Sequence, residues 1–180
     1  MRGFIAGVLA VIVVGFIAGF VVLKSGVIPA NADAKPGGLE LWAANTSLGA
    51  TLQRDAPKGP NPVALTDANL TEGVTLYGQH CALCHGSAAG DSAASAIAKG
   101  LYPAPPQFAT EGVEDDPEGV SYWKIKHGIR LTGMPSWASA LNDRQIWTIA
   151  LFLKHMDKLP AGPEAIWQQV KNQAPSPVGG

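Results

Sequence analysis

The residues with the clearest chemistry are Cys81, Cys84 and His85, which form a Cys-x-x-Cys-His run. This spacing lets two thiols bond to the vinyl groups on one porphyrin edge, while the imidazole that follows binds the iron. A structural zinc site needs further Cys or His ligands, and the chain has no other cysteine. A thioredoxin-like pair would accompany a βαβ pattern, of which the sequence gives no sign. The sequence therefore predicts one covalent haem c, attached through Cys81 and Cys84, with His85 as an axial ligand.

Two predicted helices would position this run. The first covers residues 70–81 and ends at the haem motif. Gly73 and Tyr77 lie four residues apart, so they share one face of this helix, and the glycine permits a second helix to cross closely. The other helix covers residues 143–157 and begins after Asn142, a residue type that favours helix N-termini.

This arrangement resembles class I c-type cytochromes. The resemblance lies in the spacing of Gly73 and Tyr77 before the haem motif. In that family, the N-terminal helix with this pattern crosses a C-terminal helix that carries an aromatic residue. Residues 148–154 resemble that second helix, and Phe152 would be the aromatic partner of Gly73 and Tyr77. The resemblance covers roughly residues 70–160. It implies an all-α, small class I cytochrome c fold around one covalent haem.

The resemblance also implies a second axial ligand, Met134. Met134 precedes Pro135 in a glycine-bounded loop, as in the sixth-ligand loop of the family. A thioether suits haem iron and raises its reduction potential. The other methionines are Met1, in the apolar start, and Met156, at the end of the last long predicted helix. Two alternatives remain open: Met134 fills a gap in the core, or His127 is the sixth ligand instead.

Residues 101–106 form a proline-dense turn. In the resembling family, a backbone carbonyl of such a segment accepts a hydrogen bond from the second nitrogen of the axial histidine, which fixes its tautomer. Either Pro103 or Pro105 could supply this carbonyl. Arg130 and Trp137 are candidates for hydrogen bonds to the haem propionates, because buried carboxylates need paired donors.

Residues 4–23 contain no charged side chain. A helix of this length spans about 30 Å, the thickness of a bilayer's hydrocarbon core. The alternative is a cleaved export signal, since residues 32–34 read Ala-Asp-Ala, like a signal-peptidase site. The apolar regions of such signals normally run about 7–15 residues. The longer stretch here favours an uncleaved anchor.

The charge composition limits the kinds of partner that the protein is expected to bind. Residues 1–34 hold two basic side chains and one acidic one, so 11 basic and 13 acidic residues remain beyond them, a formal charge of −2. Nucleic-acid binding would need a basic face, so it is not expected. Covalent haem attachment takes place outside the cytoplasm, which predicts a haem domain on the periplasmic side of the cytoplasmic membrane.

The predicted organisation has four parts. Residues 1–25 form a transmembrane anchor or uncleaved signal, residues 26–66 a linker with a possible amphipathic helix, residues 67–160 the haem domain, and residues 161–180 a C-terminal extension and tail. After the apolar start and the loose stretch that follows it, about ninety residues remain for one compact domain, which is few for a self-sufficient core. A buried haem would supply the missing apolar volume.

The predicted function is electron transfer, not enzymatic catalysis. A membrane-anchored monohaem cytochrome c would cycle between Fe(II) and Fe(III), either free-standing or as the cytochrome subunit of a respiratory complex. Its partners would be a membrane redox protein and the bilayer, reached through residues 4–23. The alternative is a haem enzyme or gas sensor, such as a peroxidase, with an open distal site in which His127 and Arg130 serve as the distal pair.

Overall fold

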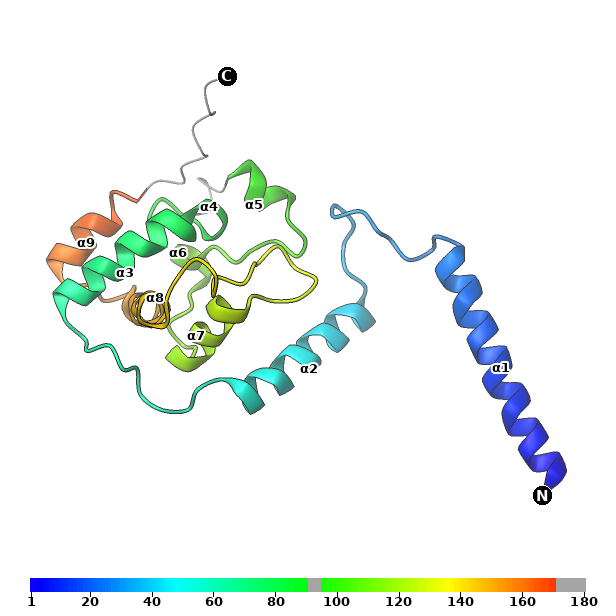
Figure 1. The fold of residues 1–180 in the computed structure, drawn as a ribbon. Coiled ribbons are helices and arrows are strands. Elements are labelled where there is room, and N and C mark those ends of the chain that lie inside the picture. The colour runs from blue at the N-terminus through cyan, green and yellow to red at the C-terminus, as the bar shows by residue number, and fades with distance from the viewer. Residues whose placement is uncertain (91–94, 171–180) are drawn as a thin grey trace. The chain divides into compact units, whose positions relative to one another are not determined.

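The computed structural model describes residues 1–90 and 95–170, and every regular element in these ranges is a helix (Figure 1). The chain divides into two units, Met1–Lys35 and Pro36–Gly180. From residue 171 on, the predicted C-terminal extension and tail lie outside the described residues. The helices are α1 (Arg2–Lys24), α2 (Gly38–Asp55), α3 (Asp67–His80), α4 (Ala82–His85), α5 (Ala96–Gly100), α6 (Phe108–Glu111), α7 (Glu118–His127), α8 (Asp143–His155) and α9 (Ala161–Trp167).

The first unit contains α1, which extends the predicted apolar helix by a residue or two at each end. Its most apolar stretch has a mean hydropathy of 2.9, and none of its side chains is buried. By length and composition, α1 can cross a membrane.

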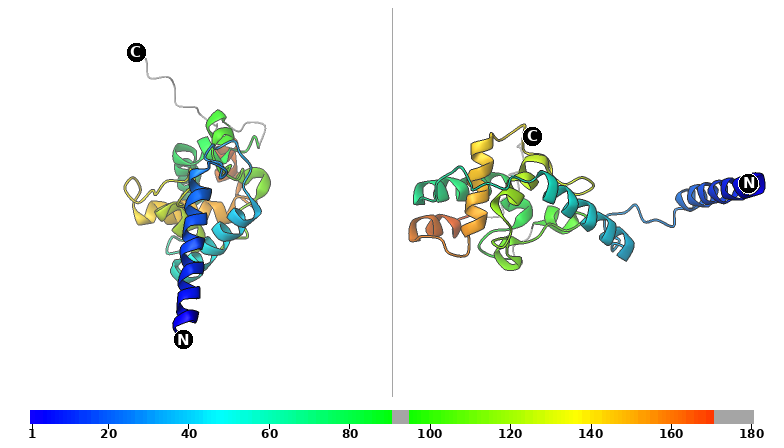
Figure 2. Two further views of the ribbon diagram at one scale, coloured as in Figure 1. Left: turned by 90° about the vertical axis from the view of Figure 1, so that its right-hand side faces the viewer. Right: turned by 90° about the horizontal axis from the view of Figure 1, so that it is seen from below.

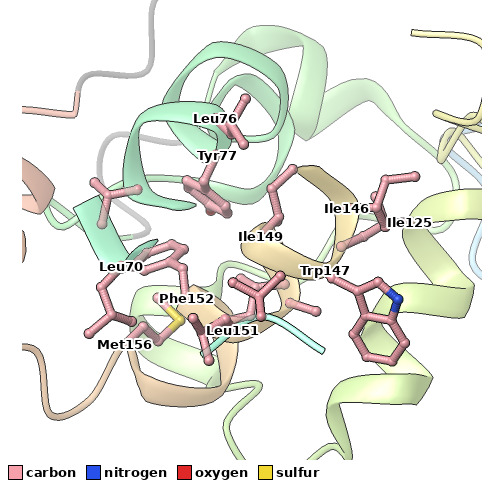
Figure 3. Close-up of a cluster of buried hydrophobic side chains, with 14 of the residues drawn as sticks. Leu70, Leu76, Tyr77, Ile125, Ile146, Trp147, Ile149, Leu151, Phe152 and Met156 are labelled. Carbon is pink, nitrogen blue, oxygen red and sulfur yellow. The ribbon is translucent and has the colours of Figure 1, made fainter. Parts of the chain in front are cut away.

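The core of the second unit forms where α3 crosses α8. A Cβ atom built on Gly73 would lie 2.6 Å from the carbonyl oxygen of Thr148 and 2.7 Å from the Cβ of Phe152. Only glycine allows this approach, and the predicted pairing of Gly73 and Tyr77 with Phe152 is confirmed. The rings of Tyr77 and Phe152 meet edge to face at 5.3 Å, inside the cluster of Figure 3.

Helix α9 closes the other side of this crossing. It lies beside α3 (Figures 1 and 2). Trp167 is 5% exposed and packs its ring against Tyr77 at 5.5 Å and against Phe152 at 5.4 Å. Three aromatic rings from three helices therefore fill one part of the core. The C-terminal extension is part of the packing of the haem domain.

Helix α7 packs against α8. The ring of Tyr122 stacks on that of Trp147, with centroids 4.2 Å apart. At one end of this contact, the Lys126 ammonium donates to the Asp143 carboxylate over 2.8 Å. Asn142 caps α8 by accepting from the backbone N–H of Gln145, as its residue type predicted. These contacts hold the helix that carries Phe152.

Helix α2 belongs to the second unit. Its C-terminal half is partly buried, and the chain that follows packs tightly on α7, where a Cβ built on Gly119 would lie 2.0 Å from the Pro57 carbonyl oxygen. At its other end, the Tyr102 hydroxyl donates to the Glu40 carboxylate over 2.5 Å. The side chains of Leu39 and Trp42 remain largely exposed.

Candidate cofactor site

The four residues predicted to hold the haem line one cavity. Cys81, Cys84, His85 and Met134 surround a space of about 490 Å³. These four side chains come from the end of α3, from α4 and from the loop after α7. Much of the remaining wall is apolar and includes Ile149 and other side chains of α3, α7 and α8. The fold therefore brings together residues about 50 positions apart in the sequence.

The haem motif is a single backbone turn. Cys81 ends α3, and its carbonyl oxygen accepts from the backbone N–H groups of Cys84 at 3.0 Å and His85 at 2.9 Å. Gly86 ends this turn with φ +84°, a conformation that side-chain-bearing residues rarely adopt. The Tyr77 hydroxyl donates to the Gly86 carbonyl over 2.9 Å. The turn is thus tied back to the buried helix crossing.

The His85 ring has two fixed neighbours. Its Nδ1 donates to the carbonyl oxygen of Pro106 over 3.0 Å, and the Phe108 ring stacks on it almost in parallel, with centroids 4.3 Å apart. The expectation that Pro103 or Pro105 supplies this carbonyl is therefore wrong. The correct segment was identified, but its prolines offer several carbonyls, and only the fold selects one.

Burial favours the neutral form of the His85 imidazole. Desolvation lowers the pKa of His85, while its hydrogen bond to Pro106 and the nearby charge of Glu111 act in the opposite direction. Neutral imidazole is the form that binds metals, and a hydrogen bond at Nδ1 leaves Nε2 free to do so. The site therefore favours the protonation state of His85 that a metal ligand needs.

The Met134 loop is held at several points. The Met134 carbonyl accepts from the backbone N–H of Ile129 over 3.2 Å, and the Met134 N–H donates to the Thr132 hydroxyl over 3.1 Å. Gly128 has φ +67°, and a Cβ built there would lie 2.6 Å from the carbonyl carbon of Pro135. These bonds and close contacts fix the backbone that presents the thioether to the cavity.

The rival ligand His127 lies elsewhere. Its side chain is exposed and packs at 5.0 Å on the Trp123 ring, and it does not line the cavity. Arg130 is also exposed and does not line the cavity. Trp137 does line it, and its ring contacts that of His80 at 5.2 Å. Of the two propionate candidates, only Trp137 is therefore at the cavity wall.

Burial favours the neutral form of both thiols. Desolvation, with a smaller contribution from Cys84, raises the pKa of Cys81 to about 12. Desolvation also raises the pKa of Cys84. Because the thiolate is the reactive and zinc-binding form, this environment does not favour a thiolate metal site.

One side of the cavity is acidic. Glu114, Asp115 and Asp116 line it, between α6 and α7. The Lys154 ammonium donates to the backbone carbonyls of Glu114 and Asp116, and Lys124 pairs with the Asp116 carboxylate at 2.7 Å. The sequence shows this acidic run but not its position, because only the lysines of α7 and α8 fix it against the cavity.

Sequence reasoning also missed Gln107 and Phe108, which approach His85 from the proline side. Gln107 is only 8% exposed. Its side-chain amide donates to the carbonyl oxygens of Cys84 at 2.9 Å and Pro105 at 3.1 Å. A glutamine after a proline run carries no sequence signal for such a role.

The residues present fit a covalently bound haem. The cavity volume falls in the usual range of roughly 300–1,000 Å³ for cofactor sites, which are mostly apolar with a few well-placed polar groups. The donor set contains two thiols for attachment, one imidazole and one thioether. The last two are the types that bind haem iron in electron carriers.

Comparison with known families agrees with this chemistry. Residues 68–153 match the family model described as cytochrome C oxidase, cbb3-type, subunit III. This match covers α3 to most of α8, and with them the cysteine motif and the Met134 loop. No curated protein matches the chain.

Proposed function

Because the chain carries a c-type cytochrome domain, which implies covalent haem c and electron transfer, we propose that it is a membrane-anchored electron carrier with a single haem. The observation that carries this proposal is the cavity shared by Cys81, Cys84, His85 and Met134. Cys81 and Cys84 would attach the haem, and His85 and Met134 would bind its iron. When bound, the haem supplies an iron that accepts and returns one electron.

The side chains at the cavity adapt the site to electron transfer. If His85 and Met134 both bind the iron, they would leave no iron position for a substrate. The Pro106 carbonyl holds the Nδ1 proton of His85, which keeps Nε2 as the ligating atom and raises its basicity. The Met134 thioether favours a high potential. The apolar wall from α8 keeps water away from the buried part of the site.

Helix α1 supports a membrane location for the carrier. It is long and apolar enough to span a bilayer, and covalent haem attachment requires the haem domain to lie on the periplasmic side. Roughly 13 residues separate α1 from α2. As a flexible chain they span about 20 Å. Such a short tether keeps the domain close to the membrane, where a respiratory complex would exchange electrons with it.

The alternative function, a haem enzyme or gas sensor with an open distal site, finds less support. It would need a distal acid–base pair, for which His127 and Arg130 were the candidates. Neither side chain lines the cavity.

Replacing Met134 by alanine tests the proposal. Met134→Ala should lower the reduction potential, abolish the long-wavelength absorption band of methionine-ligated Fe(III), and allow carbon monoxide to bind the ferrous protein. The covalent haem should remain. The matched control is His127→Ala, which should leave all three properties unchanged. If His127→Ala produces these changes and Met134→Ala does not, the ligand assignment is wrong.

A further inference from the structure

We propose that Gln107 is a positioning residue for His85, in that its side-chain amide holds the axial histidine in one orientation. The inference rests on the proposed role of His85 as an iron ligand. It adds a component that neither the haem motif nor the ligand assignment contains.

The Gln107 amide bridges two segments. Its Nε2 donates to the carbonyl oxygen of Cys84 over 2.9 Å and to that of Pro105 over 3.1 Å. Cys84 directly precedes the histidine, and Pro105 lies in the segment behind its ring. An amide nitrogen has two N–H donors, so both are used. The bridge therefore fixes the haem motif relative to the proline segment.

The residues on either side of Gln107 both contact His85. The Pro106 carbonyl accepts from the His85 Nδ1 at 3.0 Å, and the Phe108 ring stacks on the imidazole. Three consecutive residues thus act on the histidine through its ring nitrogen, its ring face and the backbone before it. A shift at Gln107 would move both ring contacts at once.

The backbone of Gln107 is also fixed. Gln107 immediately precedes α6. Its N–H donates to the Glu111 carboxylate over 2.8 Å, and its carbonyl accepts from the backbone N–H groups of Thr110 and Glu111. The side chain therefore extends from a backbone whose N–H and carbonyl groups are both hydrogen-bonded. This matters because a bridge can position its targets only when it is itself anchored.

The orientation of the amide is unambiguous. Among the described residues, Gln107 Oε1 is a buried side-chain acceptor without a hydrogen-bond partner. It faces Gly86, where an added Cβ would lie only 2.7 Å away. Turning the amide over would direct this oxygen at two carbonyl oxygens, which repel it. Burying an acceptor without a partner costs free energy, and buried polar groups in proteins are rarely left unpaired. The two hydrogen bonds that the amide nitrogen donates offset this cost.

The test compares Gln107→Met with Asn61→Leu in the full-length holoprotein. Gln107→Met approximately keeps the side-chain length but loses both donors. Asn61 is a matched control, because its amide also donates to two acceptors, the Glu118 carboxylate and the Trp147 carbonyl, but these acceptors belong to α7 and α8 and not to the haem motif or the proline segment. Both variants lose a bridge, but only the first should affect the histidine.

The expected result concerns spectra and potential. In Gln107→Met, the hyperfine-shifted haem methyl resonances of the oxidised protein should change their spread, because it depends on the axial ligand orientation. The reduction potential should shift upward, because a weaker Nδ1 hydrogen bond makes the ligand less basic and favours Fe(II). Asn61→Leu should shift neither. If the two variants give the same resonances and potential as the unchanged protein, Gln107 has no positioning role.

A measurement on the unchanged protein covers the case in which Gln107→Met does not mature. Hydrogen exchange of the Gln107 side-chain amide should be at least about a hundredfold slower than that of the exposed Gln53, because both of its N–H groups are buried and bonded. Equal rates would refute the bridge. If the unchanged protein lacks covalent haem or an axial imidazole signal, the proposed function itself fails, whatever Gln107 does.

Discussion

The crossing of α3 and α8 at Gly73 predicts opposite effects for two identical substitutions on one helix. In Gly73→Ala, the new methyl group would meet the Thr148 carbonyl oxygen at 2.6 Å and the Phe152 Cβ at 2.7 Å. Neither atom can move without moving α8. In Gly78→Ala, also on α3, the methyl group meets the Val170 side chain at 3.4 Å, an ordinary contact.

The magnitudes follow from two opposing effects. Replacing glycine by alanine inside a helix favours folding by about 1 kcal/mol. Overpacking a close contact typically costs about 1–3 kcal/mol, and the contact at Gly73 involves backbone and Cβ atoms that have no other rotamer. Gly73→Ala should therefore lower the free energy of unfolding by up to about 2 kcal/mol. Gly78→Ala should raise it by up to about 1 kcal/mol.

Guanidinium unfolding of the two oxidised holoproteins, followed by circular dichroism, measures the difference. The unchanged protein is the common reference, and the haem spectrum checks that both variants carry haem. Equal stability of the two variants, or a more stable Gly73→Ala, would mean that α3 and α8 do not pack as described.

The remaining predictions concern the two ends of the chain. A protein that starts at Lys35 should be soluble and keep its spectrum and potential, but it should exchange electrons with its membrane partner far more slowly at micromolar concentration than the full-length protein, because a tether gives an effective concentration of about millimolar. Equal rates in membrane assays would show that α1 is only an export signal. Trp167→Ala should lower the free energy of unfolding by about 3–5 kcal/mol, because it empties a buried site between Tyr77 and Phe152; an unchanged denaturation midpoint would show that α9 is not part of the core.

Much of the fold could be predicted because its signals are local or depend on residue type. The motif spacing predicts the haem, and the four-residue spacing of Gly73 and Tyr77 predicts a crossing with the helix of Phe152. Met134 could be singled out because the chain has few methionines and only this one lies in a suitable loop. Each of these inferences depends on the type of one or two residues and on the sequence next to them. The comparison with known families supports the predicted class of protein.

The rest depends on contacts between segments that share no pattern. The sequence could not show that Pro106, rather than a neighbouring proline, bonds to His85, because this depends on the path of the chain behind the ring. The bridge made by Gln107 could not be predicted either, because it joins that segment to the haem motif. The packing of α2 on α7 depends on the fit between Pro57 and Gly119, 62 positions apart. A single polar residue or glycine does not predict such a contact, because the same residue types are common in exposed loops.

Mass spectrometry of the denatured full-length protein tests the central claim most directly. The protein should be purified from cells that can mature c-type cytochromes, and its mass should exceed that of the polypeptide by one haem. Cys81→Ala and Cys84→Ala should reduce the yield of haem-bearing protein, since each removes one attachment point. A polypeptide mass with no added haem would contradict the account, as would full haem attachment in a protein that lacks both cysteines.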